Sequence, residues 1–215
     1  MMDPALKKTH LLIVEWALLF VLPVFVYLWQ PYSQTLLLML TVGLGYALFW
    51  LYRQKINWRQ EWVGRPMRGH WWGFVLRLLF VTACSAVLTA ILIPERLFAL
   101  PKHSTQLWLM VMLLYPLASA LPQEIIFRSF FFRRFPSLFP SRILMVLANS
   151  FAFAFIHIIF HNWVAPFLSL FVGFMLANSY AQHRSLRLVW IEHALYGCLA
   201  FTFGLGWFFY HGARG

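Results

Sequence analysis

The stretch Leu121-Pro122-Gln123-Glu124-Ile125-Ile126-Phe127-Arg128 places two opposite charges inside a segment that is apolar on both sides. Glu124 and Arg128 are four residues apart, so on a helix their side chains share one face and can pair. A charge at the depth of a bilayer costs at least about 2.5–3.5 kcal/mol, and such a residue is seldom kept without a partner and a use. Glu124 is also one of only six acidic residues in the chain. The stretch therefore predicts a membrane helix that carries a functional carboxylate.

The composition of the whole chain is that of a membrane protein. Of its 215 residues, 62% are hydrophobic and only 11% are charged, whereas soluble domains carry about 25% charged residues. We expect an all-α polytopic bundle with about seven transmembrane helices, since a span needs roughly 20 apolar residues. No hydrophilic stretch is long enough to form a second core, so residues 1–215 are expected to form a single integral-membrane domain. The expected spans are residues 10–29, 33–52, 71–93, 105–132, 143–160, 163–181 and 186–210.

The distribution of basic residues predicts the orientation of the chain. With the N-terminus in the cytoplasm, twelve of the 17 Lys and Arg residues fall on the cytoplasmic side and only Arg96, Lys102 and Arg214 fall on the other. This asymmetry favours a cytoplasmic N-terminus. The net charge of +11 is explained by attraction to anionic lipid, so no nucleic-acid partner is expected. The twelve are Lys7, Lys8, Arg53, Lys55, Arg59, Arg65, Arg68, Arg133, Arg134, Arg142, Arg184 and Arg187.

Further polar residues lie in two of the later expected spans. Glu192 and His193 are adjacent in the last one, and a stripe with a spacing of four runs along the fifth through Asn149, Phe153, His157 and His161. These residues lie at depths that allow a shared cavity with Glu124, nearer the cytoplasmic side of the membrane. A carboxylate with a basic partner and two histidines on separate spans can activate water for hydrolysis.

Structural roles account for some of these residues equally well. The Glu124–Arg128 pair alone could join two helices, and His161, expected at the outer interface, could form a hydrogen bond between helices. Glu15 and Arg77 are expected to extend toward a membrane interface. The basic, tryptophan-containing segment 53–70, which includes Glu61, is expected to lie in the headgroup region.

Three motifs resemble the CPBP family of intramembrane proteases, also called the Abi family, which includes CAAX prenyl protease 2 and bacteriocin-processing enzymes. They are Gln123-Glu124-x-x-x-Arg128, Phe153-x-x-x-His157 and His193. The resemblance covers about residues 108–209, and residues 105–210 are expected to form the catalytic core. It implies a hydrolase of the cell (inner or plasma) membrane that cleaves a membrane-associated peptide or protein. The catalytic residues that it implies are Glu124, Arg128, His157 and His193.

The sequence departs from the family pattern at two positions. Gln123 stands where the family has the first of two glutamates, which is usually taken as the general base, and Gly197 stands where an asparagine is common. We therefore hypothesise that Glu124 or Glu192 acts as the base, with the histidines holding water and stabilising the oxyanion. Glu192 is a possible compensating base because the sequence shows no basic neighbour for it other than His193.

Two alternatives to this metal-independent, cofactor-free hydrolysis remain. A zinc protease could use His157, His161, His193 and Glu124, although Ile158 stands where a His-Glu-x-x-His motif requires glutamate. A protein that only binds or shields a membrane partner is suggested by Gln123. A transporter with a Glu/His relay is disfavoured because no paired repeat of broken spans is visible. The sequence leaves the substrate and the oligomeric state open.

Overall fold

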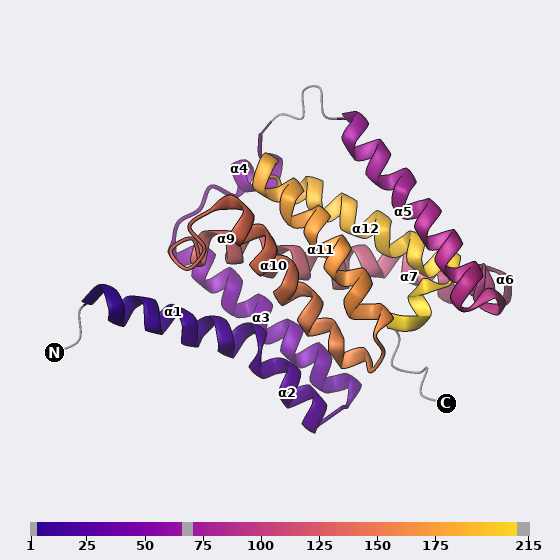
Figure 1. Cartoon of the computed structure of the whole chain (residues 1–215), viewed down its shortest axis with the longest axis horizontal. Helices are drawn as coiled ribbons and strands as arrows, with labels where there is room; N and C mark the ends of the chain where they lie inside the picture. The colour runs from indigo at the N-terminus through magenta and orange to yellow at the C-terminus, as the bar shows by residue number, and fades with distance from the viewer. Residues whose placement is uncertain (1–3, 66–70, 210–215) are drawn as a thin grey trace.

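The computed structural model of the chain describes residues 4–65 and 71–209, and every regular element within these ranges is a helix (Figure 1). Within these two ranges, six helical stretches are long and apolar enough to cross a bilayer, namely 6–29, 34–53, 71–92, 105–134, 142–160 and 164–183. The protein is therefore a multi-pass helical membrane protein. Arg68, Tyr210 and Arg214, which entered the predicted spans and charge count, lie outside the described residues.

The last expected span differs from the other six. It begins as α12 (Leu186–Phe203), turns at Gly204, and ends in the short 3₁₀ helix η5 (Leu205–Phe209). Its apolar character is lowered by Arg187 and Glu192. Because α12 contacts α5, α7 and α11, its Glu192 and His193 face protein and are buried, whereas Arg187 near its start is exposed.

The N-terminal part consists of α1 (Pro4–Phe20), α2 (Leu22–Trp29) and α3 (Ser33–Arg53). The first expected span is divided at Val21, two residues before Pro23, because proline lacks the N–H that would continue the helix and its ring collides with a carbonyl one turn earlier. Phe20 is buried and packs edge-on against Phe131, with 5.3 Å between ring centroids. This contact joins α1 to the helix that carries Glu124.

A short helix, α4 (Trp58–Val63), follows within the segment expected in the headgroup region, and it carries a buried acidic residue. Glu61 on α4 is 1% exposed. Its carboxylate accepts hydrogen bonds from Ser129 at 2.6 Å, from Tyr180 and from Arg133. The segment therefore inserts a fully hydrogen-bonded carboxylate between α9 and α11.

The third span, α5 (Trp71–Leu92), is connected through η1 (Pro94–Arg96) and α6 (Ala99–His103) to one helical stretch of 30 residues, 105–134. This stretch alternates α-helical and wider π-helical turns, which Pro116 and Pro122 favour by removing backbone N–H donors. Its parts are α7 (Thr105–Tyr115), η2 (Pro116–Ala120), α8 (Leu121–Glu124), η3 (Ile125–Phe130) and α9 (Phe131–Arg134).

The C-terminal helices lie side by side in Figure 1 and form the most closely packed part of the molecule. They are α10 (Arg142–Ile156), continued by the 3₁₀ helix η4 (His157–Phe160), then α11 (Val164–His183) and α12. The Ser141 and Ser185 hydroxyls cap the N-termini of α10 and α12 by accepting from backbone N–H groups at 3.2 Å. Gly173 on α11 faces Phe153 on α10, where an added Cβ would lie 3.1 Å from the ring. Phe153 belongs to the stripe of α10 that also contains Asn149 and His157, and all three side chains are buried.

Candidate active site

Glu124 is the last residue of α8 and lies between two π-helical stretches, with its side chain fully buried. One oxygen, Oε1, lies 2.8 Å from Nδ1 of His193 on α12. The other, Oε2, lies 3.2 Å from Nε of Arg128. Departures from regular α-helix inside a membrane helix are frequent at functional sites. The carboxylate is thus held between a guanidinium and an imidazole at the centre of the bundle.

Arg128 is completely buried and is fixed from two sides. Its Nη1 donates to Oδ1 of Asn149 on α10, and the Asn149 amide donates to the carbonyl of Phe127. Nε and Oε2 of Glu124 are close but not aligned as a hydrogen bond, so this contact is an ion pair. The proximity of Glu124 and Arg128 agrees with their spacing in the sequence. Asn149, which the sequence placed only in a stripe, positions the guanidinium.

The two histidines flank one aromatic ring. Phe153 lies 4.7 Å from the His157 ring and 5.6 Å from the His193 ring, measured between centroids. Nδ1 of His157 lies 2.6 Å from the carbonyl oxygen of Phe153. A carbonyl oxygen only accepts, so Nδ1 of His157 carries the proton. His193 likewise donates Nδ1–H to the carboxylate of Glu124, and each histidine keeps Nε2 for other partners.

His161 does not continue the stripe of α10. The α-helix ends at Ile156, residues 157–160 form a 3₁₀ turn, and His161 adopts a left-handed backbone conformation with φ 56° and an exposed side chain. The regular i,i+4 geometry expected for His157 and His161 is therefore absent. Within residues 4–65 and 71–209, no three His, Cys, Asp or Glu side chains are grouped as a metal site requires. The zinc ligand set proposed from the sequence does not fit this arrangement.

Comparison with known proteins identifies the family. Residues 103–199 match the family model described as Rce1-like, Type II CAAX prenyl endopeptidase. This segment of the chain is similar to the Rce1-like CAAX proteases. The match contains all of the motif residues described above, and it confirms the resemblance to CAAX proteases at the level of the family. Neither a curated protein nor a solved structure matches the chain. Members of that family are proteases, and the match supports a CAAX-type intramembrane protease at the level of the family.

Gln123, the first departure from the family pattern, forms its hydrogen bond one turn back along its own helical stretch. Its Nε2 donates to the Ser119 hydroxyl at 2.9 Å, and the side chain is only half-buried. Glu124, one residue later, is the carboxylate that reaches His193. The glutamine therefore leaves the contact between carboxylate and imidazole intact.

Glu192 has a different environment from the one expected. Its buried carboxylate forms an ion pair with Arg77 on α5, whose side chain is 29% exposed. The expectation that His193 is the one basic neighbour of Glu192 is therefore wrong, because the sequence gives no indication that α5 packs against α12. Arg77 was also expected to extend toward an interface, and it turns inward instead.

Glu15 on α1 also has charged and polar partners in the structure. Its carboxylate accepts from Nε of Arg134 at 2.9 Å and from the Tyr46 hydroxyl at 2.7 Å. Glu15 and Arg134 therefore join α1 to the end of α9. Four glutamates in the bundle each form an ion pair with an arginine: Glu15, Glu61, Glu124 and Glu192. This pairing is expected where an isolated charge is costly.

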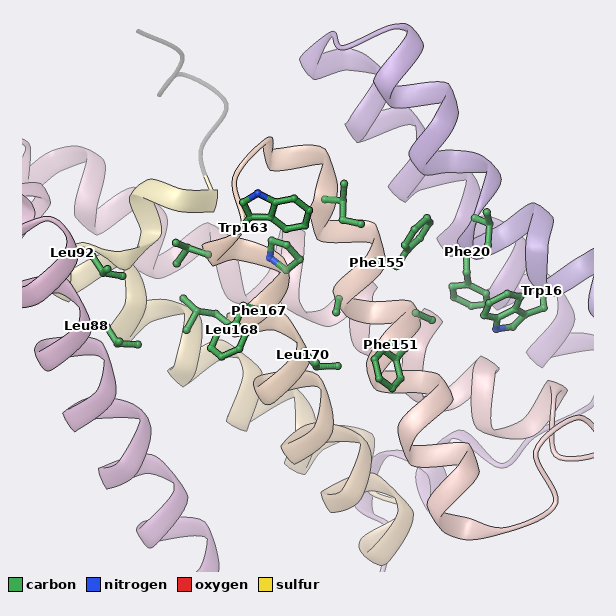
Figure 2. Close-up of a pocket in the computed structure, with 16 residues that line it drawn as sticks. Trp16, Phe20, Leu88, Leu92, Phe151, Phe155, Trp163, Phe167, Leu168 and Leu170 are labelled. Atoms are coloured by element: carbon green, nitrogen blue, oxygen red, sulfur yellow. The ribbon is translucent and has the colours of Figure 1, made fainter.

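An apolar pocket of about 890 Å³ lies on the other side of α10 from the protease site. Figure 2 shows Phe151 and Phe155 of α10 directed into it, between Trp16 and Phe20 of α1 and Phe167 of α11. Asn149, Phe153 and His157 lie on the opposite face of the same helix. The pocket therefore offers no charged group to chemistry, and the cluster around Glu124 is the candidate active site.

Proposed function

We propose that the protein is an intramembrane endopeptidase in which Glu124 and His193 together activate water against a peptide bond of a membrane-associated peptide or protein. The observation that carries this proposal is the 2.8 Å contact between Oε1 of Glu124 and Nδ1 of His193, inside the segment that matches the CAAX proteases. A buried carboxylate that orients an imidazole in this way is a recurrent arrangement for general base catalysis.

Each member of the pair has a defined role. Arg128 pairs with Oε2 of Glu124, and Oε1 of the same carboxylate accepts Nδ1–H of His193. Nε2 of His193 is then the basic nitrogen, and it removes a proton from water. The hydroxide adds to the carbonyl carbon, and the carbonyl oxygen becomes an oxyanion. The proton on Nε2 next passes to the amide nitrogen as the C–N bond breaks, which restores the neutral imidazole.

His157 is assigned to the water and the substrate. Because its Nδ1–H is used by the Phe153 carbonyl, Nε2 is an acceptor that holds one hydrogen of the attacking water. Both imidazoles pack on Phe153, so the same ring fixes the position of the two histidines relative to each other. This division uses both histidines that the motifs indicated.

We assign the base to the Glu124–His193 pair rather than to Glu192. The Arg77–Glu192 pair occupies the Glu192 carboxylate, and Glu124 has a direct contact with an imidazole. We also propose that hydrolysis needs no zinc, since Nδ1 of each histidine is already used within the protein and His161 lies outside the cluster. The protease would act in the cell membrane, with its site nearer the cytoplasmic face.

The direct test is cleavage by the full chain reconstituted in liposomes. A peptide library and a farnesylated CAAX peptide, chosen because of the family's printed description, are incubated with the wild type, with His193→Gln and with the matched control His161→Gln. We expect cleavage by the wild type and by His161→Gln, and loss with His193→Gln. Equal cleavage by all three proteins refutes the assigned role of His193. If the wild type cleaves nothing, the protein is a non-cleaving binder.

A further inference from the structure

Gly197 lies one helical turn after His193 on α12, and the ring of Tyr115 lies in the space that a side chain at position 197 would take. A Cβ built on Gly197 would lie 2.1 Å from Cε1, 2.3 Å from Cζ and 2.4 Å from the hydroxyl oxygen of Tyr115. Real Cβ atoms do not approach other heavy atoms this closely. A side chain at position 197 could therefore be placed only if the phenol of Tyr115 moved.

The Tyr115 ring lies along the face of α12 that carries the catalytic histidine. It packs edge-on against His193 at 6.0 Å and against Phe201 at 5.6 Å. Residues 193, 197 and 201 recur every four positions and form one face of the helix. A side chain at 197 would lean toward the N-terminus of the helix, and so toward His193. The Tyr115 hydroxyl therefore lies close to the Cβ position of residue 197, and the Tyr115 ring contacts His193.

Tyr115 is placed by the same helical irregularity that places Glu124. It is the last residue of α7, and the π-helical turn η2 separates it from α8. At the start of η2, Trp190 of α12 donates its indole N–H to the Pro116 carbonyl at 2.7 Å. This hydrogen bond fixes the register between α12 and the residue that follows Tyr115.

The proposed hydrolysis needs a donor for the oxyanion. Nε2 of Gln123 is bound to Ser119 and Nδ1 of His157 to Phe153. Nη2 of Arg128 has no hydrogen-bond partner among the described residues, but its guanidinium is held by Glu124 and Asn149. Removing one donor from an oxyanion site typically lowers the rate by 10²–10³-fold. A phenol hydroxyl beside the basic histidine is suited to this task.

We propose that Tyr115 is a further catalytic residue, whose hydroxyl donates a hydrogen bond to the carbonyl oxygen of the substrate as it becomes an oxyanion. The proton stays on Tyr115, and no other bond is made or broken by this residue. The role rests on the proposed endopeptidase function. Tyr115 and Gly197 act as a complementary pair: in the motif that this chain resembles, an asparagine at position 197 offers an amide donor, and here tyrosine enters from α7 over a glycine.

The test uses the reconstituted full chain and the farnesylated CAAX peptide or the best library peptide. Tyr115→Phe keeps the ring and removes only the hydroxyl, so we expect kcat to fall on the order of 10²–10³-fold with KM and the thermal unfolding temperature unchanged. Tyr52→Phe, an exposed tyrosine on α3, is the matched control and should behave as the wild type. A Tyr115→Phe variant with unchanged kcat, or with an effect confined to KM, overturns the role of Tyr115.

A second variant separates chemistry from packing. Gly197→Asn should inactivate the protein, because its Cβ collides with Tyr115, whereas combining it with Tyr115→Ala should recover at least tenfold over either single variant. Failure of the combined variant to exceed both singles, when it unfolds at the wild-type temperature, also overturns the proposal. The two proposals fail differently: a wild type that cleaves no peptide removes both, whereas an active wild type with an equally active Tyr115→Phe removes only the role of Tyr115.

Discussion

Nδ1 of His193 lies 2.8 Å from Oε1 of Glu124, although the two residues are 69 positions apart in the chain. The contact is made possible by the packing of α12 against α8 and η3. Since Arg128 binds the other oxygen of the same carboxylate, Glu124 has a structural partner and a catalytic partner at once. Substitutions of Glu124 and of His193 should therefore differ in their effects on stability and on cleavage.

Replacing Glu124 should affect both folding and cleavage, whereas replacing His193 should affect cleavage alone. Glu124→Gln leaves the buried Arg128 guanidinium without its countercharge, and breaking a buried ion pair costs about 3–5 kcal/mol. We therefore expect a lower thermal unfolding temperature and no cleavage for Glu124→Gln. His193→Gln should lose cleavage at near wild-type stability. The two variants are compared by thermal unfolding in detergent and by peptide cleavage, and equal stability of both would contradict the structural role of Glu124.

The spacing of residues within one helix was a reliable guide to the candidate site, because helical periodicity fixes which side chains share a face. The Glu124–Arg128 pair and the inward direction of Asn149, Phe153 and His157 could be predicted in this way. The stripe fails at His161, because α10 changes into a 3₁₀ turn after Ile156. No composition signal marks that change in helical geometry.

Contacts between distant helices were not predictable from spacing. Arg77 reaches Glu192 across 115 positions, and Tyr115 lies over Gly197. Each contact depends on which helices are neighbours, and one sequence without tertiary information does not determine this. A useful signal was present in Gly197: a glycine inside a helix, one turn from a candidate catalytic histidine, indicates a close approach by another group.

The Arg77–Glu192 pair provides a test of which carboxylate acts in catalysis. Glu192→Gln should destabilise the protein because it leaves Arg77 without its ion-pair partner. The double variant Arg77→Met/Glu192→Gln removes both charges, so we expect it to recover stability and to retain cleavage within about tenfold of the wild type. Thermal unfolding and kcat are measured for both. A double variant that is stable but inactive would show that Glu192 is the base.

Metal dependence is a separate prediction. The proposed chemistry uses Glu124, His193 and water, so cleavage by the reconstituted protein should persist after prolonged treatment with a strong zinc chelator. The metal content of the purified protein is measured in parallel by elemental analysis. Stoichiometric zinc, together with loss of cleavage on its removal and recovery on its return, would establish a metalloprotease instead.

The orientation in the membrane is predicted from charge alone. The positive-inside asymmetry places the N-terminus and the connection between α9 and α10 in the cytoplasm. With α12 as a seventh crossing, the C-terminus is outside. Reporter fusions at Pro140 and at Gly215 should therefore report opposite sides of the membrane. If both report the same side, α12 does not cross the bilayer and the number of crossings is six.

Gln123→Glu tests whether the departure from the family motif limits the enzyme. In the structure Gln123 donates to Ser119 and is half-buried, whereas Glu124 contacts His193. A glutamate at position 123 can accept from the Ser119 hydroxyl instead, so the substitution should preserve folding. Because the Glu124–His193 pair already supplies the base, we expect kcat/KM to change by less than about tenfold. Gln123→Met, which keeps the side-chain volume without a polar group, is the matched control. If cleavage appears only when Gln123 is replaced by glutamate, then the Glu124–His193 contact is insufficient for catalysis, and the natural protein binds its membrane partner without cleaving it.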